Sequence, residues 1–502
     1  MLGLLVMSRS FKIVNPSKMY LKGFDSKLLG EYLKYEDKKV DYELKNFIKN
    51  KWFRSKYGED VYKERLDILK KSKIKSLLFE DEEGLWTYPG LLYYLKDRYP
   101  DSEVSSDVVY PESKLVPWEH IPDYELRDYQ NKAILLLEQE KHAGIEYATG
   151  SGKSKIVIHL IKNHGLKSLV VTPSISIAEQ MYSELLLLFG KKKVGKYFGG
   201  KKEPKKQIIV AVAQSLTRIE KDSEDWEELG KCKVLAFDES HLTAAQTLSE
   251  ICFGLVKNVP YRYFVSGTQL RNDGLDLLLE AITGNIVYRL SVKDLVDQGY
   301  LAKPSFRMIR TNSPITAEPK DPNAYTRTHL YYNTKVNKIA ADLANKNAAE
   351  GKQVLVLIDE VEQFSYLLPH LKHAVGFAHG GLTKDNKGKV PTEYHDSNPN
   401  ALVKQFNNKE LPILVGTSCI STGTDIQTAK CLIFLKGGKS EIELRQSVGR
   451  GTRRVPGKDS FVFYDFDVIV NGNTACITHR HASMRKKTYE SIYPDVKEIN
   501  LL

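Results

Sequence analysis

A seven-residue segment, Ala-Thr-Gly-Ser-Gly-Lys-Ser, ends at Ser154 and combines the residue types that bind phosphate groups. Gly150 and Gly152 let backbone N–H groups close around phosphate oxygens, and Lys153 can neutralise the β and γ phosphates of a nucleotide. Ser154 supplies a hydroxyl for Mg²⁺. Tyr147 stands where the strict pattern has its first glycine, so the segment is a looser version of a phosphate-binding loop. The sequence therefore predicts a strand, a loop and a helix that bind a nucleotide.

Two adjacent carboxylates, Asp238 and Glu239, directly follow the apolar run 234–237. A buried strand would place them at the carboxyl edge of a sheet, where α/β proteins bind ligands. Asp238 is predicted to hold Mg²⁺, and Glu239 to polarise the water that attacks the γ-phosphate. The alternative is an acidic cap of a helix that begins at Leu242. Lys153, about 85 residues upstream, favours the catalytic interpretation.

Two arginines, Arg450 and Arg453, are spaced by three residues on a predicted helix in the carboxyl-terminal half. That spacing predicts that both side chains share one helical face. Such a pair can act as arginine fingers, which reach a γ-phosphate from a second domain and stabilise the charge of its transition state. The alternative is a solvated basic surface, because Arg454 follows directly and Lys458 is near. The phosphate-binding loop and the carboxylate pair, which come earlier in the chain, favour the catalytic interpretation.

The elements that must position these groups are visible as apolar runs that alternate with helical patterns, over about residues 124–300 and 354–464. This alternation predicts two parallel sheets covered by helices. A polar segment at residues 312–322 has the composition of a linker between them. Residues 11–110 are rich in lysine and aromatic residues and are predicted to form a small domain of their own. We predict three domains, at residues 1–115, 116–305 and 306–502.

The composition agrees with this organisation. The chain has 502 residues, of which 42% are hydrophobic and 27% charged, so a miniprotein and a mainly disordered chain are excluded. Its net charge of +11 is compatible with a polyanionic partner such as nucleic acid. Five isolated cysteines suit a reducing compartment, and no apolar stretch is long enough to span a membrane. We expect no membrane partner and a cytoplasmic protein, in the host cytoplasm if the source is viral.

Over about residues 124–490 the chain resembles the superfamily 2 helicases and translocases. The similar segments are Leu126 to Gln130 (the adenine-sensing segment), Thr149 to Ser154 (motif I), Asp238 to His241 (motif II in its DExH form), Ser266 to Thr268 (motif III), Gly416 to Asp425 (motif V) and Gln446 to Arg453 (motif VI). The resemblance implies an α/β fold in which two tandem RecA-like parallel-sheet domains follow a small α+β domain.

The resemblance also implies an ATP site that uses Mg²⁺. Its catalytic residues would be Lys153, Glu239, Arg450 and Arg453, and its metal ligands Ser154 and Asp238. Residues that contact the nucleotide would be Arg127, Gln130, Thr149, Gly150, Ser151, Gly152, Lys153, Ser154, Asp238, His241, Gly423, Asp425 and Gln446.

Loops on both RecA-like domains are expected to follow a nucleic-acid backbone, again by resemblance. The candidates are Thr172, Pro173, Gln180, Gly200, Gln214 and Ser215 in the first domain, and His379, Gly380 and Thr417 in the second. Hydroxyls and backbone amides of this kind bind phosphate oxygens and carry no base code. Lysines at residues 191–193, 201–202 and 205–206 flank the turn at Gly199, where they either attract a backbone or form a solvated surface.

The order of a small basic domain and two motor domains resembles the phage UvsW-type branch-migration helicases. It predicts an ATP-dependent DNA helicase or translocase that acts on branched DNA, in which the first domain recognises the substrate. The alternatives are a DExH RNA helicase, a restriction-type DNA translocase and an ATP-gated nucleic-acid clamp with low turnover. Aromatic residues of the first domain, from Tyr42 to Tyr62, could stack on unpaired bases, but we expect most of them to form its core. A monomer is compatible with the sequence, which does not fix the oligomeric state.

Overall fold

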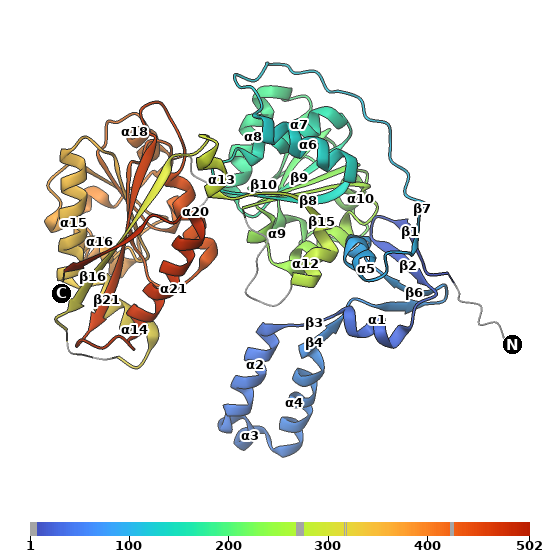
Figure 1. The fold of residues 1–502 in the computed structure, drawn as a ribbon, viewed down its shortest axis with the longest axis horizontal. Coiled ribbons are helices and arrows are strands. Elements are labelled where there is room, and N and C mark those ends of the chain that lie inside the picture. Colours follow the sequence, from blue (N-terminus) through green and yellow to red (C-terminus); the bar gives the residue numbers. More distant parts are fainter. Residues whose placement is uncertain (1–7, 268–275, 316, 318, 422–425, 502) are drawn as a thin grey trace. The chain divides into compact units, whose positions relative to one another are not determined.

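The computed structural model describes residues 8–267, 276–315, 317, 319–421 and 426–501. The chain forms two compact units (Figure 1). One unit comprises Met1–Glu146 and Lys153–Arg289, and the other comprises Tyr147–Gly152 and Leu290–Leu502.

The first unit begins with a small five-stranded sheet in the order β5-β6-β2-β1-β7. Its strands are β1 (Ser10–Asn15), β2 (Lys18–Lys22), β5 (Phe79–Asp81), β6 (Gly84–Thr87) and β7 (Glu103–Ser106), with helices α1 (Ser26–Tyr32) and α5 (Leu92–Arg98). Strand β1 pairs with β2 in the antiparallel and with β7 in the parallel direction. This mixture of strands and helices confirms the predicted α+β class of the amino-terminal part.

A helical hairpin is inserted into this small sheet and extends away from it in Figure 1. Its elements are β3 (Lys34–Glu36), α2 (Lys38–Lys49), α3 (Lys51–Tyr57), α4 (Glu59–Lys73) and β4 (Ile74–Ser76). The exposed fractions of Tyr42, Trp52 and Tyr57 are 67%, 60% and 46%. The expectation that most aromatic residues here form a core is therefore wrong for these three, because a hairpin of α2, α3 and α4 has no further layer to cover their outer faces. Phe53 and Tyr62 are half-buried and pack on Phe47.

The part of the chain that contains the small sheet packs on the part that contains the large sheet, and both contribute to one apolar core. The Tyr88 ring stacks on Phe253 with centroids 3.7 Å apart. Arg262 is fully buried, and its guanidinium donates to Ser17 Oγ at 3.0 Å and to the carbonyl oxygens of Val256 and Val259. These hydrogen bonds from one buried guanidinium to oxygens of both parts connect the small sheet to the large one.

The large sheet of the first unit has the order β11-β10-β12-β9-β13-β14-β8-β15. Its strands are β8 (His142–Tyr147), β9 (Ser168–Thr172), β10 (Val194–Phe198), β11 (Lys201–Lys202), β12 (Ile208–Val212), β13 (Val234–Asp238), β14 (Tyr261–Ser266) and β15 (Asn285–Leu290). Parallel pairings join β10 through β12, β9, β13 and β14 to β8. Its helices are α6 (Asp128–Glu140), α7 (Lys153–His164), α8 (Ile175–Phe189), α9 (Ala213–Leu216), α10 (Glu224–Gly230), α11 (Ala245–Glu250) and α12 (Asp276–Thr283). The predicted parallel sheet is confirmed.

The second unit contains a seven-stranded sheet, all of whose described pairings are parallel, in the order β18-β19-β17-β20-β21-β16-β22. Its strands are β16 (Lys303–Ser313), β17 (Val354–Ile358), β18 (Val375–Ala378), β19 (Ile413–Gly416), β20 (Cys431–Leu435), β21 (Ser460–Val470) and β22 (Val496–Leu501). Its helices are α13 (Val292–Asp297), α14 (Pro322–Thr326), α15 (Thr334–Ala349), α16 (Gln363–Leu367), α17 (Lys384–Lys387), α18 (Pro399–Asn407), α19 (Ser418–Ser421), α20 (Glu441–Gly451) and α21 (Ile477–Ile492). The second predicted α/β domain is confirmed.

The polar segment at residues 312–322 does not link the two sheets. Asn312 and Ser313 are the last residues of β16, which pairs with β21 along its whole length. The chain therefore enters the second sheet at Lys303, before this segment begins, and the linker interpretation is wrong.

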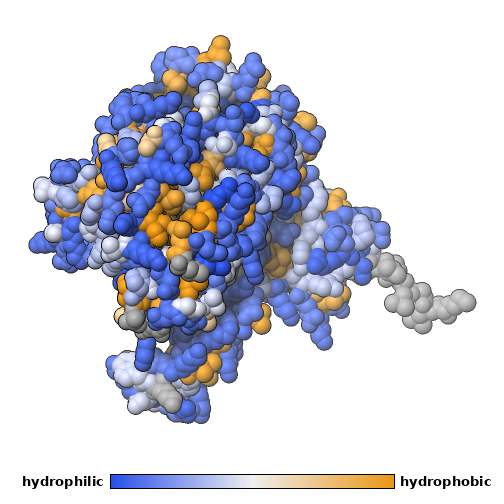
Figure 2. Space-filling model, turned by 60° about the vertical axis from the view of Figure 1, so that its left-hand side comes forward, coloured by the Kyte–Doolittle hydropathy of each residue, from blue (hydrophilic) through white to orange (hydrophobic). Residues whose placement is uncertain are grey.

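Hydrophilic residues cover most of the face that Figure 2 shows. Among the helices of the described residues, none combines the length and the apolar character that crossing a membrane requires.

A buried histidine gives the first unit a testable dependence on pH. His164 bonds to Ser113 Oγ and to the Tyr263 hydroxyl, and burial lowers its pKa to about 4. The unfolded histidine has its ordinary pKa near 6.5 and binds a proton first, so the free energy of unfolding falls as pH drops from about 6.5 to 4. We expect His164→Gln to reduce this slope by up to about 1.4 kcal/mol per pH unit in urea titrations, and substitution of the exposed His120 serves as the control for the loss of a histidine. An unchanged slope in both variants would contradict the assignment.

Candidate active site

The phosphate-binding loop lies between β8 and α7, as the sequence predicts. Gly150 and Gly152 have φ values of 88° and 79°, in the left-handed region that glycine adopts without strain. The N–H of Ser151 donates to the carbonyl oxygen of Ala148 at 3.2 Å, which closes the turn. Helix α7 begins at Lys153, so the loop leads directly into a helix N-terminus, where backbone N–H groups and the helix dipole favour an anion.

The lysine of this loop forms a buried ion pair with the predicted catalytic glutamate. Lys153 Nζ lies 3.1 Å from Glu239 Oε1, and the two side chains are 6% and 18% exposed. The N–H of Gly267 donates to Glu239 Oε2 at 3.3 Å. Because β8, β14 and β13 are neighbours in the sheet, their carboxyl ends bring these three segments together. Glu239 itself has φ 52° and ψ 46°, a strained conformation for a residue other than glycine, and such strain gathers at functional sites.

The neighbouring Asp238 has the surroundings of a metal ligand. Ser154 Oγ donates to Asp238 Oδ2 at 3.3 Å, whereas Asp238 Oδ1 is buried without a hydrogen-bond partner. Burial, with the charge of Glu239 as a second cause, raises the pKa of Asp238 to about 7. A desolvated carboxylate oxygen without a partner is stabilised by a cation. The hydroxyl of Ser154 and the carboxylate of Asp238 are both oxygen ligands, so the two residues fit Mg²⁺.

The adenine-sensing segment is ordered at the start of α6. Gln130 is buried, and its carboxamide oxygen accepts a hydrogen bond from the N–H of Arg127 at 2.9 Å. The Arg127 guanidinium donates to the Tyr129 hydroxyl at 2.8 Å. These bonds fix the segment that precedes the helix, and the contact of Arg127 and Gln130 with a base stays a prediction.

The two candidate arginine fingers lie in the second unit. Arg450 is buried in the last turn of α20, but this helix ends at Gly451. Arg453 follows the helix and forms an isolated β-bridge with Leu301, so the expectation of a shared helical face is wrong. Buried Lys458 lies nearby, and burial together with the charge of Arg453 lowers its pKa to about 7. Gln446 lies in the same helix, α20.

Some predicted residues cannot be placed. Thr268, Gly423 and Asp425 lie outside the described residues, and for His241 only the backbone is described. Thr149 and Ser151 belong to the phosphate-binding loop itself, and Ser151 is buried.

The predicted nucleic-acid residues of the first unit fall into separate places. Thr172 ends β9 and is buried, with its hydroxyl on the carbonyl oxygen of Ser174 at 3.2 Å, and Pro173 follows it. Gln180 is exposed on α8 and bonds to Glu184. Gln214 is also exposed and lies in α9.

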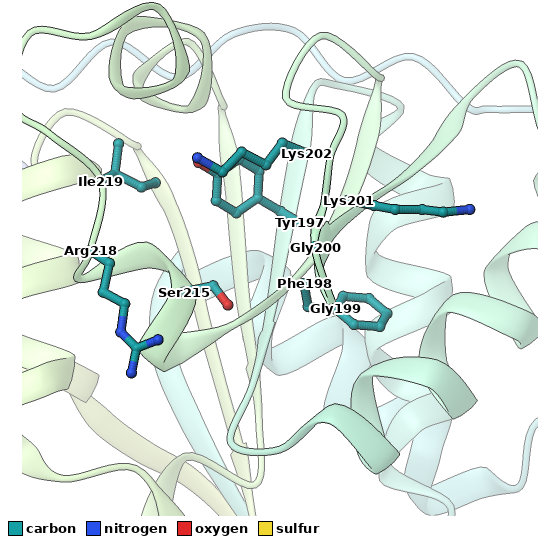
Figure 3. Close-up of a pocket in the computed structure, with 9 residues that line it drawn as sticks. All are labelled: Tyr197, Phe198, Gly199, Gly200, Lys201, Lys202, Ser215, Arg218 and Ile219. Carbon is teal, nitrogen blue, oxygen red and sulfur yellow. The ribbon is translucent and has the colours of Figure 1, made fainter.

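Gly200 and Ser215, by contrast, line one cavity of about 240 Å³. The remaining residues of its wall are Tyr197, Phe198, Gly199, Lys201, Lys202, Arg218 and Ile219 (Figure 3). Arg218 was not among the predicted residues. It follows α9 in a turn, and no sequence pattern places it beside Ser215.

The structure brings the three predicted residues of the second unit to one edge of the sheet. His379 and Gly380 follow β18 and Thr417 follows β19, and the N–H of Thr417 donates to the carbonyl oxygen of Ala378 at 3.1 Å. The buried His379 ring bonds to the carbonyl oxygen of Tyr394 and to the N–H of Gly381. Its imidazole therefore holds the loop in place, while Gly380 leaves open space above the backbone.

Several lysines near the Gly199 turn are paired with carboxylates. Ion pairs join Lys193 to Glu119, Lys202 to Asp225 and Lys205 to Glu224. Exposed pairs of this kind contribute little to stability and exchange readily for other anions.

Two family models match the chain in the order that the motifs predict. Residues 123–268 match the model described as type III restriction enzyme, res subunit, and residues 334–455 match the helicase conserved C-terminal domain. The DNA 3'-5' translocase XPB2 of Sulfurisphaera tokodaii is 30% identical over 251 residues, which cover 47% of this chain and about half of that protein (52%). The ATP-dependent DNA helicase uvsW of Enterobacteria phage T4 is 22% identical over 375 residues, which cover 72% of this chain and 70% of that protein.

A solved structure supports the fold. A fragment assigned to an HsdR subunit of a type I restriction enzyme from Vibrio vulnificus has a TM-score of 0.54 at 18% sequence identity and covers 76% of this chain and 69% of that chain. Together with the two matched domains, the sheets and loops described above imply ATP-dependent helicase activity. The chain belongs to the superfamily 2 helicases and translocases.

Proposed function

We propose that this protein is an ATP-dependent DNA helicase or translocase that remodels branched DNA, such as forks, Holliday junctions and R-loops, in replication, recombination or repair. The observation that carries the proposal is the convergence of Lys153, Glu239, Ser154 and Asp238 at one edge of the first large sheet. The names of two relatives, the uvsW helicase and the XPB2 translocase, support DNA as the substrate, whereas a relative from Acanthamoeba polyphaga mimivirus is named as an ATP-dependent RNA helicase.

In this proposal each residue has a defined task during ATP hydrolysis. The loop amides and Lys153 bind the β and γ phosphates, and Glu239 orients the attacking water and accepts its proton. Ser154 and Asp238 would hold Mg²⁺, which neutralises phosphate charge when it is bound. Arg450 and Arg453 stabilise the charge that develops on the γ-phosphate. Nucleotide states that differ in their affinity for DNA then convert hydrolysis into movement along the strand.

The central test is steady-state ATP hydrolysis with and without DNA, at a stated salt concentration because phosphate contacts depend strongly on salt. A motor is expected to hydrolyse ATP faster when DNA is present. ATP binding with little turnover on any nucleic acid would favour a clamp instead. Stimulation by forks, four-way junctions, R-loops, plain duplex and RNA then ranks the substrates, and equal stimulation by all of them would contradict the preference for branched DNA.

A second candidate is translocation along duplex DNA without strand separation. The res-subunit model and the name of the XPB2 relative favour it. Displacement of a triplex-forming strand from plain duplex, without unwinding of that duplex, would support this candidate over helicase activity.

We assign recognition of the DNA substrate to the amino-terminal domain, and its helical hairpin supports this assignment. Between residues 34 and 76 there are 14 lysines and arginines and 8 acidic residues, a net charge of +6 out of +11 for the chain. The tip, residues 46–58, has four cations and no acidic residue. Lys56 Nζ lies 4.6 Å from the centre of the exposed Trp52 ring. A cation beside an exposed indole suits a phosphate next to an unpaired base.

Replacement of Trp52 tests this assignment. Stacking of an aromatic side chain on a base contributes about 1–3 kcal/mol, so Trp52→Ala is expected to weaken binding to a fork with unpaired nucleotides by about fivefold or more. Fluorescence anisotropy at fixed salt would measure the affinity. Tyr42→Ala is a matched control, because Tyr42 is an equally exposed aromatic residue of the same hairpin outside the tip. Equal losses in both variants, or none in either, would contradict the role of the tip.

A further inference from the structure

Side-chain contacts hold one wall of the cavity beside the β10–β11 turn in place. The Tyr197 hydroxyl donates to Asp225 Oδ2 at 2.6 Å, and Lys202 Nζ lies 3.7 Å from the same oxygen. Burial and the charge of Asp225 raise the pKa of Tyr197, so this phenol stays neutral and keeps its hydrogen bond. With Ile219, the ring gives the cavity an apolar surface that needs no rearrangement before a ligand binds.

Polar and cationic groups surround this apolar wall. In Figure 3, Ser215, Arg218 and Ile219 lie on the same side of β10 as Tyr197 and Lys202, while Phe198 and Lys201 extend on the other side. The strand register agrees, because Tyr197 pairs with Lys202 and Phe198 with Lys201. Arg218 is exposed, and among the described residues no ion pair engages its guanidinium. The cavity thus has an apolar wall, a hydroxyl and a cation at its rim.

The turn that borders the cavity is open to an approaching strand. Gly199 and Gly200 have φ values of 60° and 80°, which a two-residue hairpin turn requires. A Cβ atom added at either position would meet no atom within 4 Å, so space remains above the backbone. A phosphodiester can therefore reach the backbone of this turn without a steric clash.

We infer that this cavity receives one unpaired nucleobase of the strand that passes the Gly199–Gly200 turn, with Arg218 on a neighbouring phosphate. This inference rests on the proposed function, because it names the form of nucleic acid that the site takes. A phosphate alone would leave the apolar surface of the partly exposed Ile219 against water, whereas a base covers it. A volume of about 240 Å³ equals roughly eight liquid waters and suits one flat heterocycle rather than a base pair.

Removal of a single base is expected to weaken binding at one position of the bound strand and not at the others. Single-stranded DNA carrying one abasic site would be scanned position by position against the full-length protein, with affinity measured by anisotropy at fixed salt. At one position the abasic site is expected to weaken binding by about tenfold, in the range of one base stacked on a protein surface. Ile219→Trp and, separately, Ser215→Leu fill the cavity. Each is expected to weaken binding of the intact strand, so that intact DNA and DNA with the abasic site bind with equal affinity.

Arg218→Ala and Lys233→Ala separate a phosphate contact at the cavity from the general loss of one positive charge. Arg218→Ala is expected to weaken binding and to lower the salt slope by about one, because one phosphate contact is lost. Lys233→Ala removes an exposed cation that directly precedes β13 and does not line the cavity, so it is the matched control and should preserve the position-specific abasic effect. If abasic sites have equal effects at all positions while DNA still binds and stimulates ATP hydrolysis, the base pocket is wrong and the proposed function stands. If DNA neither binds nor stimulates hydrolysis, the proposed function itself fails.

Discussion

Glu239→Gln is expected to lower DNA-stimulated ATP hydrolysis by about 10²- to 10⁴-fold, the usual contribution of a general base. Glutamine retains an oxygen that can accept the N–H of Gly267, which lies 3.3 Å from Glu239 Oε2. It cannot accept a proton from water, and it leaves Lys153 without the carboxylate that lies 3.1 Å away. ATP and DNA binding should persist, because the loop, Lys153 and the nucleic-acid residues are unchanged. Hydrolysis under single turnover, with binding of a fluorescent ATP analogue measured in parallel, separates these effects.

A matched control uses a glutamate outside the site. Glu250 lies in α11 and bonds to Gln246, so Glu250→Gln changes the same charge without touching Lys153. It should retain normal hydrolysis. Retained turnover in Glu239→Gln would reject Glu239 as the base, and equal losses in both variants would point to a general effect of charge or stability, which thermal unfolding would reveal.

The strands of the two large sheets were predictable where a whole strand is apolar. The runs at 169–172 and 234–237 became β9 and β13, because strands that are buried on both faces of a parallel sheet carry continuous apolar sequence. Strand β10 was missed, since Val-Gly-Lys-Tyr-Phe contains a glycine and a lysine. Strand β16 was missed, and its last two residues were mistaken for a linker, because its polar and charged side chains find partners only in the folded sheet. Arg310 pairs with Asp467, 157 residues away, and no local pattern announces such a partner.

The candidate site, too, could be predicted from the sequence only in part. The types and spacing of Lys153, Asp238 and Glu239 predict their chemistry, and adjacent parallel strands bring them together. The left-handed backbone of Glu239 and the unpartnered Oδ1 of Asp238 could not be predicted, since both depend on how β13 ends against the surrounding core. Helical spacing also failed for Arg453, because it assumes that the helix continues, and α20 ends two residues earlier.

Arg450→Ala is expected to reduce ATP hydrolysis by about 10³- to 10⁵-fold, the contribution of an arginine finger to phosphoryl transfer. Its guanidinium stabilises charge that is largest in the transition state, so the rate of the chemical step should fall far more than the affinity for ATP. Single-turnover hydrolysis together with equilibrium nucleotide binding would show this separation. Arg450 is buried, so thermal unfolding must show that the variant remains folded, and Arg450→Lys provides a second variant that keeps the positive charge.

The neighbouring arginines decide whether the effect is catalytic or a matter of local charge. Arg454 pairs with Asp459 and donates to the carbonyl oxygen of Gly299, so Arg454→Ala removes a nearby cation that already has partners. It should retain most of the hydrolysis rate. Arg453→Ala is expected to reduce hydrolysis as Arg450→Ala does, and it should also raise the pKa of Lys458, since the charge of Arg453 helps to lower it. Equal and modest losses in all three variants would mean that these arginines form only a basic surface, and the assignment of a catalytic pair would then be wrong.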